Sequence, residues 1–245
     1  VSLRTQGAIL ALGILFILLD LITEPMHPVI DLAWVTVIIC GLPLLINSVN
    51  SIWDNLEIHA NFLVVIAMVA LIAIGDYHTA AYVGIIVHAG FFLEQLITGD
   101  AHYTLDDDML PAMPAQLVAL RQGINNYSSV IVVAVMLLSM GSFALTQDFV
   151  HTVTLLLVLC PCSLELILVA LMMGSLVDDN SPVSELSKGA KQSHLGLLIV
   201  SILFHVAIIG TGVLGLIDPV TAVALHGLAR LGLVYNLKVL DGYLC

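Results

Sequence analysis

The chain has 245 residues, of which 60% are hydrophobic and only 10% are charged, and its mean hydropathy is +1.10. Because a soluble globular domain carries about 25% charged residues, this composition excludes a soluble domain and predicts an all-α, polytopic helix bundle in a lipid bilayer. The formal net charge of −12, with only six Lys and Arg, argues against nucleic acid as a partner.

Eight stretches are apolar and long enough to cross a bilayer, which needs roughly 20 residues of helix. They are residues 6–23, 32–50, 59–75, 79–98, 127–146, 150–176, 194–216 and 219–240. Short connections pair them, so we expect a two-helix N-terminal membrane hairpin over 1–58 and a six-helix core over 59–245. Two polar segments, 99–126 and 177–193, are predicted to be short bridges, because a domain usually needs about 40 residues or more. The initial Val1 predicts a processed or trimmed chain.

The cations predict the orientation of the chain in the membrane. With an even number of spans both termini lie on one side, and the lysines and arginines fall on that side or, in the last span, towards it. They are Arg4, Arg121, Lys188, Lys191, Lys238 and, within the last span, Arg230. Cytoplasmic segments of membrane proteins carry the excess of Lys and Arg. We therefore expect an integral, multi-pass membrane protein whose termini and bridges are cytoplasmic.

The motif Cys160-Pro161-Cys162 lies in an uncharged run, residues 152–164, at the expected depth of the bilayer. Proline removes a backbone donor and clashes with the preceding turn, so the helix must kink or unwind there. Irregular backbone at this depth is tolerated only where it is buried in protein or lines a cavity. Two thiolates at such a break suit a soft or borderline transition metal. The plainer alternative is that both thiols are buried as small hydrophobic groups.

Four segments carry motifs that occur together, in this order, in one family. Residues 57–77 begin EIHANFL and end GDY, residues 92–94 read FLE, residues 159–164 read LCPCSL, and residues 236–240 read NLKVL. In the same order, they resemble four features of the heavy-metal-translocating P-type ATPases. These are the third span with its Gly-Glu turn, the Leu-Glu end of the fourth span, the Cys-Pro-Cys-Ala-Leu signature and the closing Asn-Ala-Leu-Arg-Leu. The resemblance covers most of the chain. It implies eight spans, a transport core over 59–245, and binding of the transported ion by Cys160 and Cys162.

The chain lacks the motifs that drive such an ATPase. Its sequence contains no Thr-Gly-Glu actuator motif, no Asp-Lys-Thr-Gly-Thr phosphorylation motif and no Gly-Asp-Gly hinge, and the two short bridges stand where the family inserts those domains. Phosphoryl transfer requires groups that hold Mg²⁺ and phosphates, so we expect no ATPase activity of this chain alone. A metal donor or a motor protein is the expected partner, besides the metal ion and the lipid bilayer.

Three further side chains are candidate ligands. His226 lies in mid-span, where ionisable groups are costly and usually functional, and the resemblance places it at the metal-selecting position; an interhelical hydrogen bond is the alternative. His205 lies 21 residues earlier, across a hairpin that turns at 218–219, which predicts depths that differ by several ångströms. Glu165, three residues after Cys162, is a candidate fourth ligand or counter-charge, and a snorkelling carboxylate is the alternative.

The donor set predicts the ion. Two thiolates and one or two imidazoles form a tetrahedral set that suits Zn²⁺, with Zn–S bonds of about 2.3 Å and Zn–N bonds of about 2.0–2.1 Å. Zn²⁺ or Cd²⁺ is therefore favoured, followed by Co²⁺. Cu⁺ is ranked third, because the last span lacks the Met-Ser pair of the family's copper-type members.

Other polar residues are given plainer interpretations. His88, in mid-span six residues before Glu94, either faces an ion path or, as we favour, is hydrogen-bonded to a neighbouring span. Four residues near the turns of the opposite face are interpreted as solvated rather than as an exit vestibule: Asp76, His78, Asp148 and His151.

Three functions are compatible with this sequence. The favoured one is transition-metal binding and translocation without an ATP-driven motor. The second is a non-catalytic excised or redesigned membrane scaffold that keeps the fold and has no transport. The third is a membrane enzyme with a catalytic zinc, which needs an open coordination position and for which Glu165 would be the general base.

Overall fold

The computed structural model describes residues 3–23, 32–55, 61–98, 115–160 and 184–244, and within these ranges the chain is helical with no strand. The helices are α1 (Leu3–Thr23), α2 (Ala33–Asn55), α3 (Asn61–Ala73), α4 (Tyr77–Thr98), α5 (Ala115–Thr146), α6 (Phe149–Val158), α8 (Ser184–Val213) and α9 (Pro219–Leu244). In a bilayer a helix satisfies all backbone groups within one segment, which favours this architecture for so apolar a chain. The predicted all-α fold is confirmed.

Among the described residues, five helices are long and apolar enough to cross a membrane. The stretches concerned are Leu3–Ile22, Ala33–Trp53, Tyr77–Ile97, Ser129–Thr146 and Leu195–Val213. α3 and α6 are also apolar but have 13 and 10 residues, fewer than the roughly 20 that a full crossing needs. The predicted last span is a continuous helix, α9, which carries Arg230 and Lys238. The fold is that of a polytopic helix bundle, and the number of its crossings stays a prediction.

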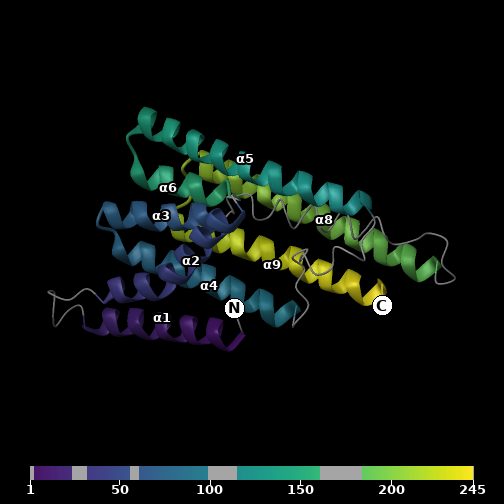
Figure 1. Ribbon diagram of the computed structural model, residues 1–245, viewed down its shortest axis with the longest axis horizontal. Coiled ribbons are helices and arrows are strands. Elements are labelled where there is room, and N and C mark those ends of the chain that lie inside the picture. Colours follow the sequence, from purple (N-terminus) through teal and green to yellow (C-terminus); the bar gives the residue numbers. More distant parts are fainter. Residues whose placement is uncertain (1–2, 24–31, 56–60, 99–114, 161–183, 245) are drawn as a thin grey trace.

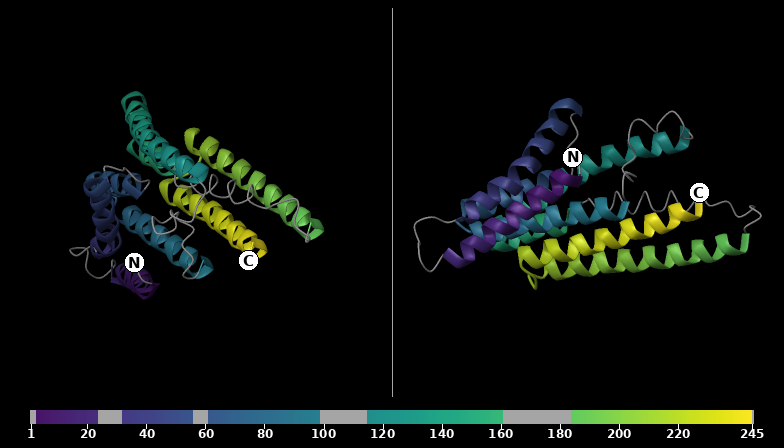
Figure 2. Two further views of the ribbon diagram at one scale, coloured as in Figure 1. Left: turned by 45° about the vertical axis from the view of Figure 1, so that its right-hand side comes forward. Right: turned by 90° about the horizontal axis from the view of Figure 1, so that it is seen from below.

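α4 and α9 lie at the centre of the bundle (Figure 1; Figure 2). α4 packs against α1, α2, α3 and α9, while α9 also packs against α6 and α8. Buried aliphatic side chains such as Leu63, Leu71, Val83 and Val153 form the core between these helices. Because α3, α4, α6 and α9 meet there, residues far apart in the sequence share one interior.

The two predicted bridges are partly helical. α5 begins at Ala115 and α8 at Ser184, so residues 115–126 and 184–193 continue these helices beyond the predicted spans, as Figure 1 shows. Ala, Leu, Gln, Arg, Lys and Glu are good helix formers and make up much of both stretches. These parts of the bridges are helical because low hydropathy ends a span without ending a helix, and their role as bridges stays a prediction.

The three short hairpin turns within the described residues are built in the same way. Each first helix closes on a residue in the left-handed region, which is Gly75 at φ 83°, Gln147 at φ 56° or Gly215 at φ 68°, as helix C-caps commonly do. Each following helix begins after an aspartate that accepts a hydrogen bond from a backbone N–H three residues on. These bonds join Asp76 to Thr79 at 3.1 Å, Asp148 to His151 at 3.1 Å and Asp218 to Thr221 at 2.8 Å. The aspartates thereby satisfy donors that the helix itself leaves open.

Asp20 joins three helices at the end of the bundle that carries these turns. Its buried carboxylate accepts a hydrogen bond of 2.7 Å from the N–H of Leu32, just before α2. The same carboxylate lies 2.8 Å from Nε2 of His78 on α4. Because a carboxylate only accepts, the imidazole donates. The interpretation of His78 as simply solvated is therefore wrong: it is half-exposed, and it pairs with a buried acid.

His88 is buried between α1, α2 and α4. Its Nε2 donates to the carbonyl oxygen of Cys40 at 2.8 Å, and its Nδ1 lies 3.1 Å from Oε1 of Gln6. Only 1% of the residue is exposed. The favoured interpretation of His88, a histidine hydrogen-bonded to neighbouring spans, is confirmed.

Candidate metal centre

The helix breaks at Cys160, as the following proline predicts. α6 ends at Val158, the N–H of Leu159 still donates to the carbonyl of Leu155 at 3.0 Å, and Cys160 itself is not helical. Steric contact with a proline ring pushes the preceding residue away from helical backbone angles. Cys160 is only 7% exposed. Its thiol therefore lies at an irregular point of the backbone inside the bundle.

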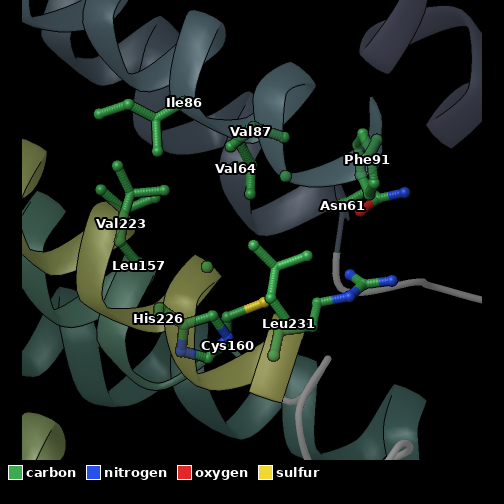
Figure 3. Close-up of a pocket in the computed structure, with 13 residues that line it drawn as sticks. Asn61, Val64, Ile86, Val87, Phe91, Leu157, Cys160, Val223, His226 and Leu231 are labelled. Carbon is green, nitrogen blue, oxygen red and sulfur yellow. The ribbon is translucent and has the colours of Figure 1, made fainter. Parts of the chain in front are cut away.

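A cavity of about 60 Å³ lies against Cys160 (Figure 3). Its walls come from α3, α4, α6 and α9, and its polar lining residues are Asn61, Cys160, His226 and Arg230. The remaining lining residues are apolar or glycine. A cavity needs about 10–15 Å³ on this measure to hold one water molecule. The space is thus large enough for an ion, next to one thiol and one imidazole.

The imidazole of His226 meets a second histidine. Its ring centre lies 5.4 Å from that of His205 on α8, with the two planes at 86°. Nδ1 of His205 donates to the carbonyl oxygen of Ser201 at 2.8 Å, so in the neutral ring the lone pair is on Nε2. Hydrogen bonds of this kind orient the histidines that bind metals.

The predicted difference in depth between these histidines is wrong. His205 lies eight residues before the end of α8 at Val213, and His226 lies seven residues after the start of α9 at Pro219. These separations correspond to about 12 and 10 Å of helix. The sequence placed the turn at 218–219, whereas α8 already ends five residues earlier, where Gly215 takes the left-handed conformation.

An ion pair that the sequence analysis missed borders the same cavity. Arg230 lines the cavity from α9, and its Nη2 lies 2.9 Å from Oε2 and 3.2 Å from Oε1 of Glu94 on α4. Its guanidinium carbon also lies 5.5 Å from the ring centre of Phe91. Two opposite charges in separate spans were visible in the sequence. Their pairing depends on the α4–α9 contact, which local patterns do not show.

Three of the five predicted ligands are described, and they lie in one region. Cys160 and His226 line one cavity, and His205 contacts His226. Cys162 and Glu165 lie outside the described residues. Among the residues that the structure describes, no three His, Cys, Asp or Glu side chains form a group that could hold a metal. A metal centre here would need a ligand beyond those ranges, for which Cys162 is the predicted candidate.

No protein-family model matches the chain, and no curated protein or solved structure matches it either. The resemblance to the heavy-metal-translocating P-type ATPases rests on the motif residues alone and stays a prediction. Function has to be inferred from the cavity and its donor atoms.

Proposed function

We propose that the chain binds a transition-metal ion inside the membrane, at Cys160 and Cys162 together with His226, and translocates it across the bilayer. One observation carries this proposal: Cys160, at the break after α6, and His226, from α9, are both buried and line the same cavity. Thiolate and imidazole are the donors that Zn²⁺ and its neighbours prefer. Ionisable groups inside a membrane are costly and are usually functional, which supports this proposal.

The contact between His205 and His226 supports a site with two imidazoles. Two imidazoles on one tetrahedral zinc, with Zn–N bonds of about 2.0–2.1 Å, place their ring centres about 5 Å apart. The observed separation is 5.4 Å. Edge-to-face packing of two rings without a metal has a similar spacing. Whether His205 binds the metal after loading separates the two-imidazole site from plain ring packing.

Zn²⁺ or Cd²⁺ is the proposed cargo, followed by Co²⁺ and then Cu⁺. Two thiolates neutralise a divalent ion, whereas with Cu⁺ they leave one negative charge. An uncompensated charge is costly in an apolar interior, and the cavity is lined mainly by apolar side chains. Charge balance and donor softness therefore favour a divalent ion.

We propose that translocation by this protein is passive or is driven by a partner. Its sequence carries none of the motor motifs, so we assign no ATP-driven step to it, and a metal donor or a motor protein is the proposed partner. The distribution of lysine and arginine favours cytoplasmic termini. Translocation would then connect the cytoplasm with the face that carries the Asp-capped turns.

Bound metal, measured by mass spectrometry on detergent-purified protein, tests the site. We expect about one zinc ion per chain for a single tetrahedral site, and its loss in Cys160→Ser and in Cys162→Ser. His88→Gln is the matched control, because His88 is an equally buried intramembrane histidine that faces α1 and α2. Zinc flux into liposomes then tests translocation.

Three outcomes separate the proposed function from its alternatives. Zinc that is bound by the wild type and lost in both cysteine variants supports the site. A wild type that binds no metal even after loading refutes it and leaves a membrane scaffold without transport. A hydrolytic activity that disappears in Glu165→Gln would instead identify the chain as a zinc enzyme.

A further inference from the structure

The ion pair of Glu94 and Arg230, here named the rim pair, borders the cavity through Arg230, which lines it from α9. The side chains of Arg230 and Glu94 are 23% and 19% exposed, whereas Cys160 and His226 are each 7% exposed. Arg230 follows His226 by four residues on α9, so the two residues share one face of that helix. The rim pair is thus more exposed to the surroundings than the thiol and the imidazole of the cavity that Arg230 lines.

The rim pair faces the end of the bundle that carries both termini. Glu94 lies near the C-terminal end of α4, and Arg230 lies beyond His226 in the direction of the C-terminus. The guanidinium is held from two sides, by both oxygens of Glu94 and by the ring of Phe91. Charge-assisted hydrogen bonds are stronger than neutral ones, and a cation over an aromatic face gains further attraction. These contacts fix a bulky positive group against the cavity.

We propose that the rim pair controls access to Cys160 from the end of the bundle that carries the termini. While Glu94 holds Arg230 in place, the guanidinium blocks this side of the cavity, and its charge opposes the approach of a cation. Access requires the Nη2–carboxylate contacts to break, so that α4 and α9 no longer share a charge pair there. The identity of the cargo rests on the proposed function; the closure itself is a property of the cavity and needs no metal.

The test uses the thiol of Cys160 as the reporter. The detergent-purified full chain, without added metal, is treated with a small methanethiosulfonate reagent, and labelling of each cysteine is followed by peptide mass spectrometry. We expect Glu94→Gln and Arg230→Met each to accelerate labelling of Cys160 about tenfold, which corresponds to about 1.4 kcal/mol of lost closing free energy. Because both variants break one interaction, the double variant should add little to either single one.

Two controls make the result specific. His78→Gln changes the hydrogen bond to Asp20 at the opposite end of α4 and should leave the Cys160 rate unchanged. Cys40 is completely buried and should stay unlabelled in all variants.

The proposal is overturned if both single variants label Cys160 at the wild-type rate. It is equally overturned if the Cys160 and Cys40 rates rise together, since the whole bundle has then loosened. A different outcome would refute the proposed function alone: the wild type binds no zinc, while the rim variants still accelerate the labelling of Cys160. A wild type that binds zinc but shows unchanged labelling rates in the variants retains the proposed function and refutes the gate.

Discussion

At the scale of single residues, Gly212 lets α8 approach the end of α6. A Cβ atom there would lie 2.9 Å from Cγ2 and 3.1 Å from Cγ1 of Val158, which is fully buried. A valine in a helix has one strongly preferred rotamer and cannot easily turn its methyl groups aside. We expect the added methyl group of Gly212→Ala to destabilise the fold by about 1–3 kcal/mol through overpacking. This cost exceeds the gain of about 1 kcal/mol from the higher helix propensity of alanine. Gly212→Ala should therefore lower the melting temperature in detergent.

Gly210→Ala is the matched control for this prediction. Nothing lies within 4 Å of a Cβ atom at position 210 on the same helix, so this variant should melt at the wild-type temperature or above it. Val158→Ala should recover part of the loss when it is combined with Gly212→Ala, because the removed methyl groups are the ones that clash. Equal melting temperatures for Gly210→Ala and Gly212→Ala would contradict the close packing of α6 and α8.

Single residues also show which parts of the site were predictable from sequence. The break at Cys160 follows from the proline next to it, which is a local effect. The meeting of His205 with His226 was not predictable, because it depends on where α8 stops and thus on the conformation of Gly215. The pairing of Arg230 with Glu94 joins residues 136 positions apart. It follows from helix packing rather than from any spacing in the chain.

At the scale of elements, Asp218 anchors the start of α9 in a pH-dependent way. Hydrogen bonds from the side chain and then the backbone of Thr221 hold the pKa of Asp218 below its usual range. A carboxyl whose pKa is lower in the folded state than in the unfolded state stabilises the fold at every pH above its unfolded-state pKa of about 3.9. This stabilisation is lost as the pH falls through the lower, folded-state value. We expect it to be complete at neutral pH and to disappear below about pH 4.

Asparagine at position 218 isolates this effect, because it caps helices as well as aspartate does and does not titrate. The difference in melting temperature between wild type and Asp218→Asn, measured from pH 7 downwards, should shrink as the carboxyl is protonated. It should be small throughout, since Asp218 is exposed and solvent screens its charge. Asp218→Ala removes the cap itself and should cost about 1 kcal/mol at neutral pH. A constant difference between wild type and Asp218→Asn would contradict the assignment.

The helices themselves were largely predictable, because long apolar stretches in a bilayer have almost no alternative to helix. Hydropathy placed every described helix within or next to a predicted span. It did not give the length of α6, which has 10 residues, because apolar residues continue past the end of this helix. It also missed the helical parts of the bridges, where helix propensity rather than apolarity decides.

At the scale of the whole molecule, the orientation in the membrane decides from which side the rim pair is reached. The hairpin turns lie at one end of the bundle and both chain ends lie towards the other. The excess of Lys and Arg on the side of the termini favours a cytoplasmic location for that side. The rim pair would then open towards the cytoplasm, and the Asp-capped turns would face the other compartment.

Cysteine labelling of intact cells with a membrane-impermeant maleimide tests this orientation. Leu216 is largely exposed in the turn between α8 and α9, so Leu216→Cys should be labelled from outside. Native Cys245 should react only after permeabilisation, and the buried Cys40 should react in neither case. The opposite pattern for positions 216 and 245 would place the termini outside. The rim pair would then face the external medium.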